Sequence, residues 1–185
     1  MKALTVGLLG IGTVGSGTFH VLARNHEEIR RLAGRDIRIT TVADLDTARA
    51  KSIVGDQAKV VADARQVIAD PSIDVVIELI GGYGIARTLV MEAIAAGKHV
   101  VTANKALLAV HGSEIFAAAR EKGVVVAFEA AVAGGIPIIK ALREGLTANR
   151  IEWIAGIING TTNFILSEMR AKGLDAHSAV VDIRD

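Results

Sequence analysis

The amino-acid sequence predicts an α/β fold with a doubly wound parallel sheet, followed by an incomplete α+β segment. Two observations support this prediction. Between residues 4 and 128, short runs of β-branched and aliphatic residues alternate with longer helical patterns, which is the order of parallel β-α-β units. Glycines mark most of the joints between these runs, as expected for the tight turns that connect strands to helices.

The N-terminal part of the chain is expected to form two strands and the helix between them. Leu4 to Leu9 is a compact apolar run, which is typical of a strand buried on both faces. Apolar residues then recur at helical spacing, and a charged helix tail ends at Gly34. Ile37 to Ala43 is a β-branched strand pattern closed by Asp44. No element is assigned to residues 45–74.

The middle of the chain repeats this alternation of strands and helices. The expected elements are a strand at Val75 to Ile80, a helix at Ile85 to Ala96, a strand at His99 to Thr102, a helix at Ser113 to Lys122 and a strand at Val124 to Phe128. The second of these helices is expected to be capped by Ser113 and stopped by Gly123. Elements in this order build one parallel sheet with helices on both faces.

A change in composition after Phe128 indicates a second domain. The segment Ala130 to Pro137 is small and glycine-rich, which is typical of an interdomain hinge. The expected elements beyond it are a helix at Ile138 to Leu146, a strand at Ile151 to Ile158 and a helix near Thr161 with Thr161 or Thr162 as its cap. These elements either pack on the first domain or begin a second that is cut short. We assign residues 1–130 to a dinucleotide-binding domain and residues 131–185 to the truncated start of the next.

Composition and charge argue against several classes of partner. Hydrophobic residues make up 51% of the chain and charged residues 22%, which is typical of a well-packed soluble protein. The formal net charge is +1 and no basic cluster occurs, so nucleic acid is not an expected partner. The absence of cysteine excludes disulfides, thiolate metal sites and cysteine nucleophiles. Neither a signal peptide nor an apolar run of roughly 20 residues, which could span a membrane, is present, so a cytoplasmic location is expected.

A G-x-G-x-x-G motif lies between the first expected strand and the first helix. Its residues are Gly10, Ile11, Gly12, Thr13, Val14 and Gly15. In this position the first glycine permits the tight turn, the second lets a pyrophosphate approach the backbone, and the third lets the helix pack closely on the strand. The amides and dipole at the helix N-terminus then bind the phosphates. The motif predicts a Rossmann-like site for a dinucleotide, and the alternative is a tight turn without a ligand.

Asp44 is the candidate ligand for the adenosine ribose. It follows the second expected strand, where a carboxylate can accept hydrogen bonds from ribose hydroxyls, although it lies further from the motif than the usual ~20 residues. A carboxylate there disfavours a 2′-phosphate, so NAD fits better than NADP. Arg49 is close enough in sequence to change that preference, and the alternative for Asp44 is a solvated turn residue.

Five short segments carry further motifs along nearly the whole chain. They are GLLGIGTVGSG at 7–17, ELIGG at 78–82, GKHVVTANK at 97–105, EAAVAGGIP at 129–137 and NGTTNF at 159–164. Together and in this order, these segments resemble the homoserine dehydrogenase family. The resemblance implies reversible, NAD(P)-linked hydride transfer between L-homoserine and L-aspartate 4-semialdehyde, in threonine and methionine biosynthesis.

Lys105 follows a strand whose carboxyl end should face the cofactor crevice of an open α/β sheet. A lysine there can hold a phosphate, a ribose or a substrate carboxylate. The resemblance implies that Lys105 contacts both cofactor and substrate, and that Gly81 and Thr102 contact cofactor. The alternatives are a surface lysine at a helix start, a simple turn at Gly81, and a helix cap at Thr102 or Asn104.

Two further sites follow from the resemblance alone. Gly160 and Thr161 are implied to contact substrate, with pure helix capping as the alternative. A sodium ion is implied at main-chain carbonyls of Glu129, Val132, Gly134 and Ile136. Oxygen ligands suit a hard cation, and the alternative for this loop is a glycine hinge.

No residue of the sequence is assigned as the catalytic proton donor. Hydride addition to an aldehyde needs a proton for the developing alkoxide. In the family that the chain resembles, a lysine further along the chain supplies it, near an aspartate and a glutamate that bind the substrate's amino group. Those residues lie in and after a GYxExDP segment, and residues 1–185 contain no such segment. The chain by itself is therefore expected to bind cofactor with little turnover, and the parent enzyme to be a homodimer acting on a small molecule. The alternatives are a non-catalytic dinucleotide-binding module that needs a partner chain, or a related amino-acid reductase.

Overall fold

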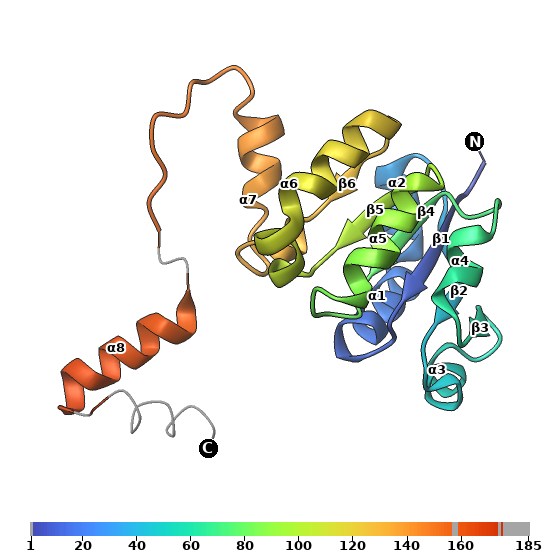
Figure 1. Cartoon of the computed structure of the whole chain (residues 1–185), viewed down its shortest axis with the longest axis horizontal. Helices are drawn as coiled ribbons and strands as arrows, with labels where there is room; N and C mark the ends of the chain where they lie inside the picture. The colour runs from blue at the N-terminus through green and yellow to red at the C-terminus, as the bar shows by residue number, and fades with distance from the viewer. Residues whose placement is uncertain (1, 157–158, 174, 176–185) are drawn as a thin grey trace. The chain divides into compact units, whose positions relative to one another are not determined.

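The computed structural model describes residues 2–156, 159–173 and 175 (Figure 1). The chain divides into two compact units, Met1–Ala141 and Leu142–Asp185. The predicted boundary after residue 130 concerns where the cofactor domain ends, and it stays a prediction.

The first unit is built on a parallel sheet of six strands. They are β1 (Leu4–Leu9), β2 (Ile37–Ala43), β3 (Lys59–Val61), β4 (Val75–Glu78), β5 (His99–Thr102) and β6 (Val126–Ala127). Their order in the sheet is β3-β2-β1-β4-β5-β6, and every neighbouring pair is parallel. From β1 the chain builds outward in one direction to β3 and then returns to β4 on the other side. This reversal between β1 and β4 is the topological switch point of a doubly wound, Rossmann-like sheet.

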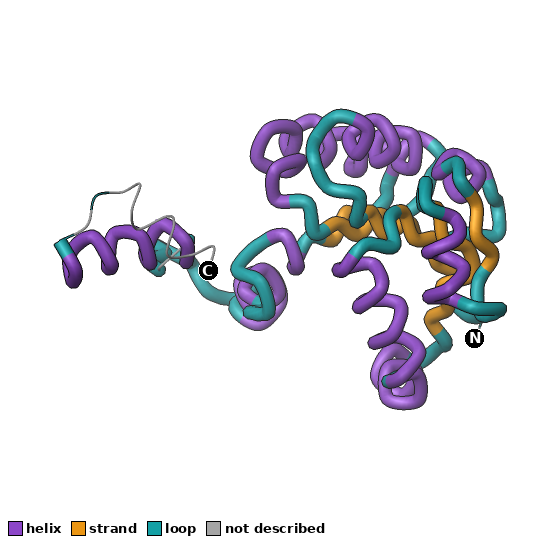
Figure 2. Tube along the Cα trace, turned by 90° about the horizontal axis from the view of Figure 1, so that it is seen from below, coloured by secondary structure: helices purple, strands orange, loops and turns teal. Residues whose placement is uncertain are grey.

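Six helices cover the sheet. They are α1 (Thr13–Arg24), α2 (His26–Ala33), α3 (Thr47–Val54), α4 (Ala64–Ala69), α5 (Ile85–Ala95) and α6 (Lys105–Lys122). Figure 2 shows helices on both sides of the layer of strands. The predicted α/β class is therefore confirmed.

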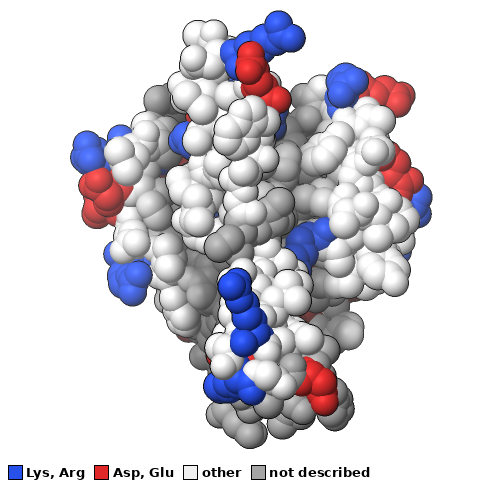
Figure 3. All heavy atoms as spheres, turned by 90° about the vertical axis from the view of Figure 1, so that its left-hand side faces the viewer, with Lys and Arg blue, Asp and Glu red and all other residues white. Residues whose placement is uncertain are grey.

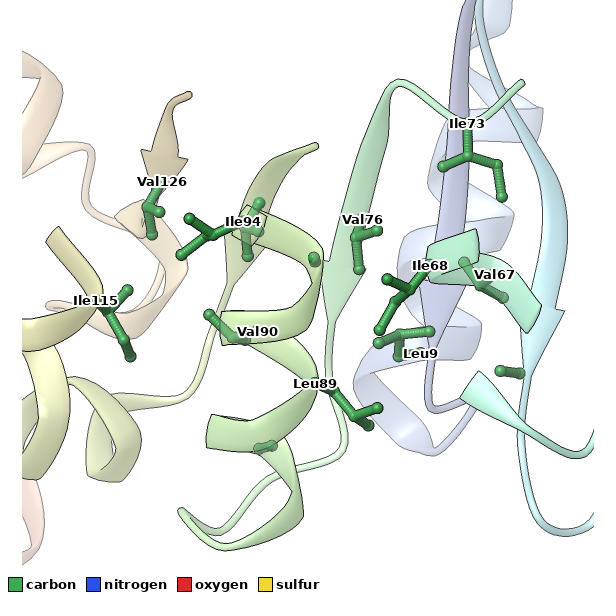
Figure 4. Packing of buried hydrophobic residues seen from close by; sticks show 14 of the residues in the cluster. Leu9, Val67, Ile68, Ile73, Val76, Leu89, Val90, Ile94, Ile115 and Val126 are labelled. Atoms are coloured by element: carbon green, nitrogen blue, oxygen red, sulfur yellow. The ribbon is translucent and has the colours of Figure 1, made fainter. Parts of the chain in front are cut away.

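Each face of the sheet buries its own hydrophobic core. One core joins β1 and β4 to α4, α5 and α6, and Figure 4 shows its packing. The other core lies between the sheet, α1 and α3. Leu8 and Leu9 are neighbours in β1, both are fully buried, and they belong to opposite cores. Because successive strand residues point to opposite faces, a strand buried on both sides must be apolar throughout.

Three predicted strands, at residues 4–9, 37–43 and 99–102, are confirmed with the same bounds. Two others are shorter than predicted. β4 ends at Glu78, because the amide of Ile80 donates to the Glu78 carboxylate at 2.9 Å instead of to a neighbouring strand. β6 contains only Val126 and Ala127 and pairs with β5 alone.

The prediction that Ser113 caps a helix was wrong. The helix begins at Lys105, and the side chain of Asn104 caps it by accepting a hydrogen bond from the amide of Leu107 at 3.1 Å. The helix continues through Gly112 and Ser113 to its left-handed end at Gly123. A glycine inside a helix is tolerated when the flanking turns are packed, and Leu107 and Ile115 are both buried.

The elements α3, β3 and α4 fall in the segment to which no element was assigned. They are short, and their apolar patterns are correspondingly weak. Their helix caps were a usable signal. Asp46 and Asp63 accept hydrogen bonds from the amides of Arg49 and Arg65, each at 2.9 Å.

The segment after β6 is only partly as predicted. A 3₁₀ turn at Glu129–Ala131 is followed by α7 (Ile138–Lys140), which widens into a π-helical turn at Ala141–Gly145. The predicted helix at 138–146 is therefore present as a short α turn that does not continue as an α-helix. Residues 151–156 have no regular secondary structure, so the predicted strand is wrong there, and residues 157–158 lie outside the described residues. A strand needs a neighbour to satisfy its backbone groups, and the described part of this unit offers none.

The second unit contains α8 (Gly160–Lys172), which begins close to the predicted position. Its cap is Asn159, whose side-chain oxygen accepts from the amide of Thr162 at 2.9 Å, so the prediction of a threonine cap was wrong. An Asn cap leaves the threonine hydroxyls outside the capping bond.

The surface carries charges of both signs. On the face drawn in Figure 3, lysine and arginine side chains lie beside acidic ones and do not form one continuous patch. Within the described part of the chain, no helix combines the length and the apolar composition needed to cross a membrane.

Candidate functional site

The candidate site lies at the carboxyl ends of the strands, beside the switch point between β1 and β4. The loops that follow the strands all lie at this edge of the sheet, because the strands run in parallel. Those next to the predicted cofactor-binding residues are the glycine-rich turn after β1, the Asp44 turn after β2, the loop after β4 and the loop between β5 and α6. Open α/β sheets bind their ligands in this crevice.

The three glycines of the G-x-G-x-x-G motif have different structural environments. Gly10 has φ +91°, a conformation that L-residues rarely adopt. A β-carbon on Gly15 would lie 2.1 Å from the carbonyl oxygen of Gly10, so α1 packs directly on the turn. A β-carbon on Gly12 would meet no heavy atom within 4 Å. The turn therefore has no space for a side chain at Gly10 or Gly15, whereas the space above Gly12 is open.

The N-terminus of α1 is free of a side-chain cap. Gly12 occupies the cap position and makes no side-chain hydrogen bond, and Thr13 and Val14 after it are exposed. The first amides of a helix have no partner within the helix, and the helix dipole makes this end electropositive. The geometry is that of an anion-binding helix start.

Asp44 connects the end of β2 to the glycine-rich turn. Its Oδ2 accepts a hydrogen bond from the amide of Ile11 at 2.8 Å, and its Oδ1 accepts from the amide of Asp46 at 2.9 Å. The side chain is half-buried, so it is not a freely solvated turn residue. Each carboxylate oxygen has a second lone pair, which leaves capacity for a ligand hydroxyl.

A cavity of about 440 Å³ opens between this turn and the loops after β3 and β4. Its size is within the usual range for small-molecule sites. Its lining is Gly10, Gly12, Ala43, Asp44, Leu45, Ala62, Asp63, Ala64, Arg65, Leu79, Ile80, Ile85 and Leu89. The charged members are Asp44, Asp63 and Arg65, and the Arg65 guanidinium is paired with Glu92 at 2.9 Å. Hydrogen bonding to Glu92 raises the pKa of Arg65.

Glu78 is a site residue that the sequence analysis did not single out. It ends β4, is fully buried, and accepts hydrogen bonds from the amides of Ile80 at 2.9 Å and Gly81 at 3.1 Å. Its other oxygen accepts from the hydroxyl of Thr102 at 2.7 Å. An acidic residue at the end of an otherwise apolar strand was the available signal, since such a residue is rarely buried without partners.

Thr102 and Asn104 extend this network into the loop before α6. The Thr102 hydroxyl accepts from the amide of Asn104 at 3.0 Å, while the Asn104 side-chain amide donates to the carbonyl of Gly82. Thr102 is 1% exposed, and its hydroxyl donates to Glu78 and accepts from the amide of Asn104. Of the two residues considered as helix caps, Thr102 and Asn104, it is Asn104 that caps α6. Contact of Thr102 with cofactor stays a prediction.

Lys105 is the first residue of α6 and is exposed. Its side chain makes no hydrogen bond or ion pair with any residue that the structure describes. Gly81 lies in the loop after β4, with φ +85° and open space at its β-carbon position. The Asn104–Gly82 hydrogen bond joins the loops that carry these two predicted cofactor residues.

The loop from Glu129 to Ile136 has the backbone of a tight, irregular turn. Ala133 and Gly134 have φ of +56° and +58°. The Glu129 carboxylate caps α7 through the amides of Ile139 at 2.8 Å and Lys140 at 2.9 Å. The carbonyl of Glu129 accepts from the amide of Val132 and that of Ile136 from the amide of Ile138. Each of these two carbonyls keeps a second lone pair, and carbonyl oxygens are suitable ligands for a hard cation. A sodium ion at this loop stays a prediction.

The predicted substrate residues Gly160 and Thr161 open α8 in the other compact unit. Both are exposed. Their contact with substrate stays a prediction.

Comparison with known proteins identifies two matching family models. The model described as homoserine dehydrogenase, NAD binding domain, matches residues 10–129, and the model described as homoserine dehydrogenase matches residues 137–185. The homoserine dehydrogenase of Pseudomonas aeruginosa is 65% identical over 94% of this chain, and that of Neisseria gonorrhoeae is 58% identical over 99%. The chain spans 39% and 41% of these two proteins.

Solved structures give the same result. The crystal structure of a homoserine dehydrogenase from Thiobacillus denitrificans matches with a TM-score of 0.89 and 62% identity, over 98% of this chain and 42% of that one. A hyperthermophilic archaeal homoserine dehydrogenase in complex with NADPH matches with a TM-score of 0.78 over 98% of this chain and 60% of that one. At 23% identity, this second likeness supports the fold alone.

Proposed function

Because this chain belongs to the homoserine dehydrogenase family, we propose that it binds a nicotinamide dinucleotide and that the whole protein interconverts L-homoserine and L-aspartate 4-semialdehyde. One observation carries the cofactor proposal. The turn from Gly10 to Gly15 lies at the switch point of the sheet, is open at Gly12, and borders a cavity of about 440 Å³.

The geometry supports one placement of the cofactor. Its adenosine half occupies the cavity, with the ribose hydroxyls at Asp44, and its pyrophosphate lies on the N-terminus of α1 above Gly12. Its nicotinamide half then extends toward Gly81 and Lys105. When bound, the nicotinamide supplies the hydride acceptor or donor.

The charges of the cavity favour NAD over NADP. Two carboxylates, Asp44 and Asp63, line it, and the guanidinium of Arg65 is already paired with Glu92. A 2′-phosphate would add negative charge beside these carboxylates without a free cation from the cavity lining to balance it. Arg49 follows in α3 and is the residue that could offset this preference.

Substrate binding is proposed for Lys105, Gly160 and Thr161. The exposed ammonium of Lys105 can attract a substrate carboxylate. For Gly160 and Thr161 the support is their place in the NGTTNF segment, where a backbone amide and a hydroxyl can form hydrogen bonds. In this proposal the Lys105 ammonium binds the negatively charged substrate carboxylate, and Lys105 is not the proton donor. No residue of 1–185 is assigned that role, and we expect little turnover by this chain alone.

Further properties of the whole protein are proposed on weaker support. The carbonyls of Glu129, Val132, Gly134 and Ile136 form the proposed sodium site, supported by the oxygen donors and the left-handed backbone at Ala133 and Gly134. A homodimeric parent enzyme, a cytoplasmic location and a small-molecule substrate are proposed from family membership.

Calorimetric titration of the purified chain with NADH and NADPH tests the proposal. We expect one dinucleotide per chain in the micromolar to millimolar range, with NADH tighter than NADPH. Homoserine is then added with NAD, and the absorbance of reduced cofactor is followed. Failure to bind either dinucleotide would contradict the cofactor proposal, and turnover by the chain alone would show that a proton donor lies within it.

A further inference from the structure

The loops after β4 and β5 are held together by a hydrogen-bond network with Glu78 at its centre. The buried carboxylate accepts from two backbone amides of one loop, those of Ile80 and Gly81, and from the hydroxyl of Thr102 at the start of the other. Charged acceptors form stronger hydrogen bonds than neutral ones, and a buried carboxylate needs several of them. All three donors come from residues that border the crevice.

Asn104 closes the network from the other side. Its side-chain amide donates to the carbonyl of Gly82, and its side-chain oxygen caps α6 at the amide of Leu107. One side chain therefore sets both the position of the β4 loop and the first turn of α6. Lys105 is the next residue and the first of α6, so these two hydrogen bonds of Asn104 also fix the position of its backbone.

The network also decides which groups of the β4 loop face a ligand. The amides of Ile80 and Gly81 are directed to the Glu78 carboxylate, so they are not available to bind phosphate. Gly81 and Gly82 adopt φ of +85° and +67°, and their β-carbon positions are open. The loop thus offers an uncharged backbone without free amides at Ile80 and Gly81, unlike the helix start of α1.

We propose that Glu78 and Asn104 are positioning residues for the nicotinamide half of the cofactor. They hold the Gly81 backbone and Lys105 at a fixed separation, so that the nicotinamide end meets a preorganised surface. Asp44 holds the adenosine side in a similar way, by accepting the amide of Ile11. This inference rests on the proposed function, in which the adenosine half binds in the cavity beside Gly12.

The variant Asn104→Asp tests this inference with least disturbance of the fold. Aspartate keeps the cap on α6 but cannot donate to the carbonyl of Gly82. We expect its affinity for NADH to fall about tenfold, as loss of one such hydrogen bond predicts. Its affinity for ADP-ribose, which lacks the nicotinamide, should stay within about twofold of the parent. Both ligands are measured by calorimetry on the 185-residue chain.

Two further variants complete the design. Glu78→Gln places an amide NH₂ group where either the Thr102 hydroxyl or the amides of Ile80 and Gly81 need an acceptor. It should therefore lower the affinity for NADH and leave the affinity for ADP-ribose nearly unchanged. Lys98→Met is the matched control, because Lys98 is also buried and hydrogen-bonded but lies just before the opposite end of β5. It should lower the Tm without changing the ratio of NADH to ADP-ribose affinity.

The outcomes separate this inference from the proposed function. Selective loss of NADH affinity in Asn104→Asp supports it, even where Glu78→Gln fails to fold. Equal affinities in variant and parent, or equal losses for both ligands, overturn it while leaving cofactor binding in place. A parent chain that binds neither NADH nor ADP-ribose overturns the proposed function and this inference together.

Discussion

Gly15 lies against the carbonyl of Gly10, so closely that a β-carbon on Gly15 would come within 2.1 Å of that oxygen. Gly12 lies between them in the same turn and has no heavy atom within 4 Å of its β-carbon position. One glycine is therefore required for the packing of α1 on β1, and the other leaves space above the turn. The two requirements can be separated experimentally.

We predict that Gly15→Ala destabilises the fold while Gly12→Ala impairs binding alone. The methyl group at Gly15 meets a backbone oxygen that cannot move without shifting β1 or α1, so a loss of about 3 kcal/mol in unfolding free energy is expected, at the upper end of the usual cost of overpacking. At Gly12, with φ −60°, the methyl group is compatible with the backbone and occupies only the open space. NADH affinity of Gly12→Ala should fall about tenfold or more, with an unchanged Tm.

Chemical denaturation and calorimetric titration of the two variants provide the measurements. The parent chain serves as the reference for both. Unchanged NADH affinity in a folded Gly12→Ala variant would show that the pyrophosphate does not approach this turn.

The strands could be predicted from the sequence because their burial demands a simple pattern. Leu8 and Leu9 belong to opposite cores, so every residue of β1 had to be apolar or small, and the run was visible. The glycine-rich turn was equally accessible, because its backbone geometry admits few other residues. Its ligand could be inferred only from the order of strand, turn and helix.

The hydrogen-bond network of the site could not be predicted in the same way. Glu78 and Asn104 are 26 positions apart, and nothing in their local sequence shows that β4 and β5 become neighbours. The sequence predicts Ser113 as the cap of this helix, whereas the structure has Asn104 as the cap and starts the helix at Lys105. The strand expected at 151–158 depended on partners that the described residues do not include.

Substitution of Asp44 should change the cofactor preference. Asp44→Asn keeps one oxygen to accept the amide of Ile11 but removes the negative charge beside the proposed ribose. We expect NADH affinity to fall about tenfold and NADPH affinity to change less, so that the ratio moves toward NADPH. Calorimetric titration with both cofactors measures this ratio. A ratio that stays constant, or moves toward NADH, would rule out a role for Asp44 in discrimination.

Lys98 is predicted to contribute to stability and not to binding. Its ammonium donates to the carbonyls of Asp70 at 2.6 Å and Ile73 at 2.7 Å, which satisfies the end of α4 and the turn before β4. Burial lowers the pKa of this lysine. Lys98→Met removes the side-chain donor to both carbonyls, although the Asp70 carbonyl keeps the amide of Ile73 at 3.2 Å. We expect a loss of about 1–3 kcal/mol in unfolding free energy. Urea denaturation measures it, and a variant as stable as the parent would mean that water replaces the amine.

The ion pair between α5 and α6 should make stability depend on acid pH. Arg87 on α5 forms a two-point hydrogen bond with Glu114 on α6, and His111 lies 2.8 Å from the same carboxylate. The hydrogen bond from Arg87 lowers the pKa of Glu114 from 4.5 to about 2. A carboxyl whose pKa is lower in the folded state contributes stability at pH values above 4.5, and this contribution is lost as the pH falls toward 2.

The variant Glu114→Gln isolates this contribution. It cannot ionise, so it should be less stable than the parent at pH 7, and the difference should shrink between pH 4.5 and pH 2. Other acids with lowered pKa, such as Asp36 and Asp70, destabilise parent and variant alike in this range and cancel in the comparison. Denaturation curves at several pH values give the difference directly. If it stays constant from pH 7 to pH 2, Glu114 joins α5 to α6 by shape and hydrogen bonding, and its charge does not stabilise the pair.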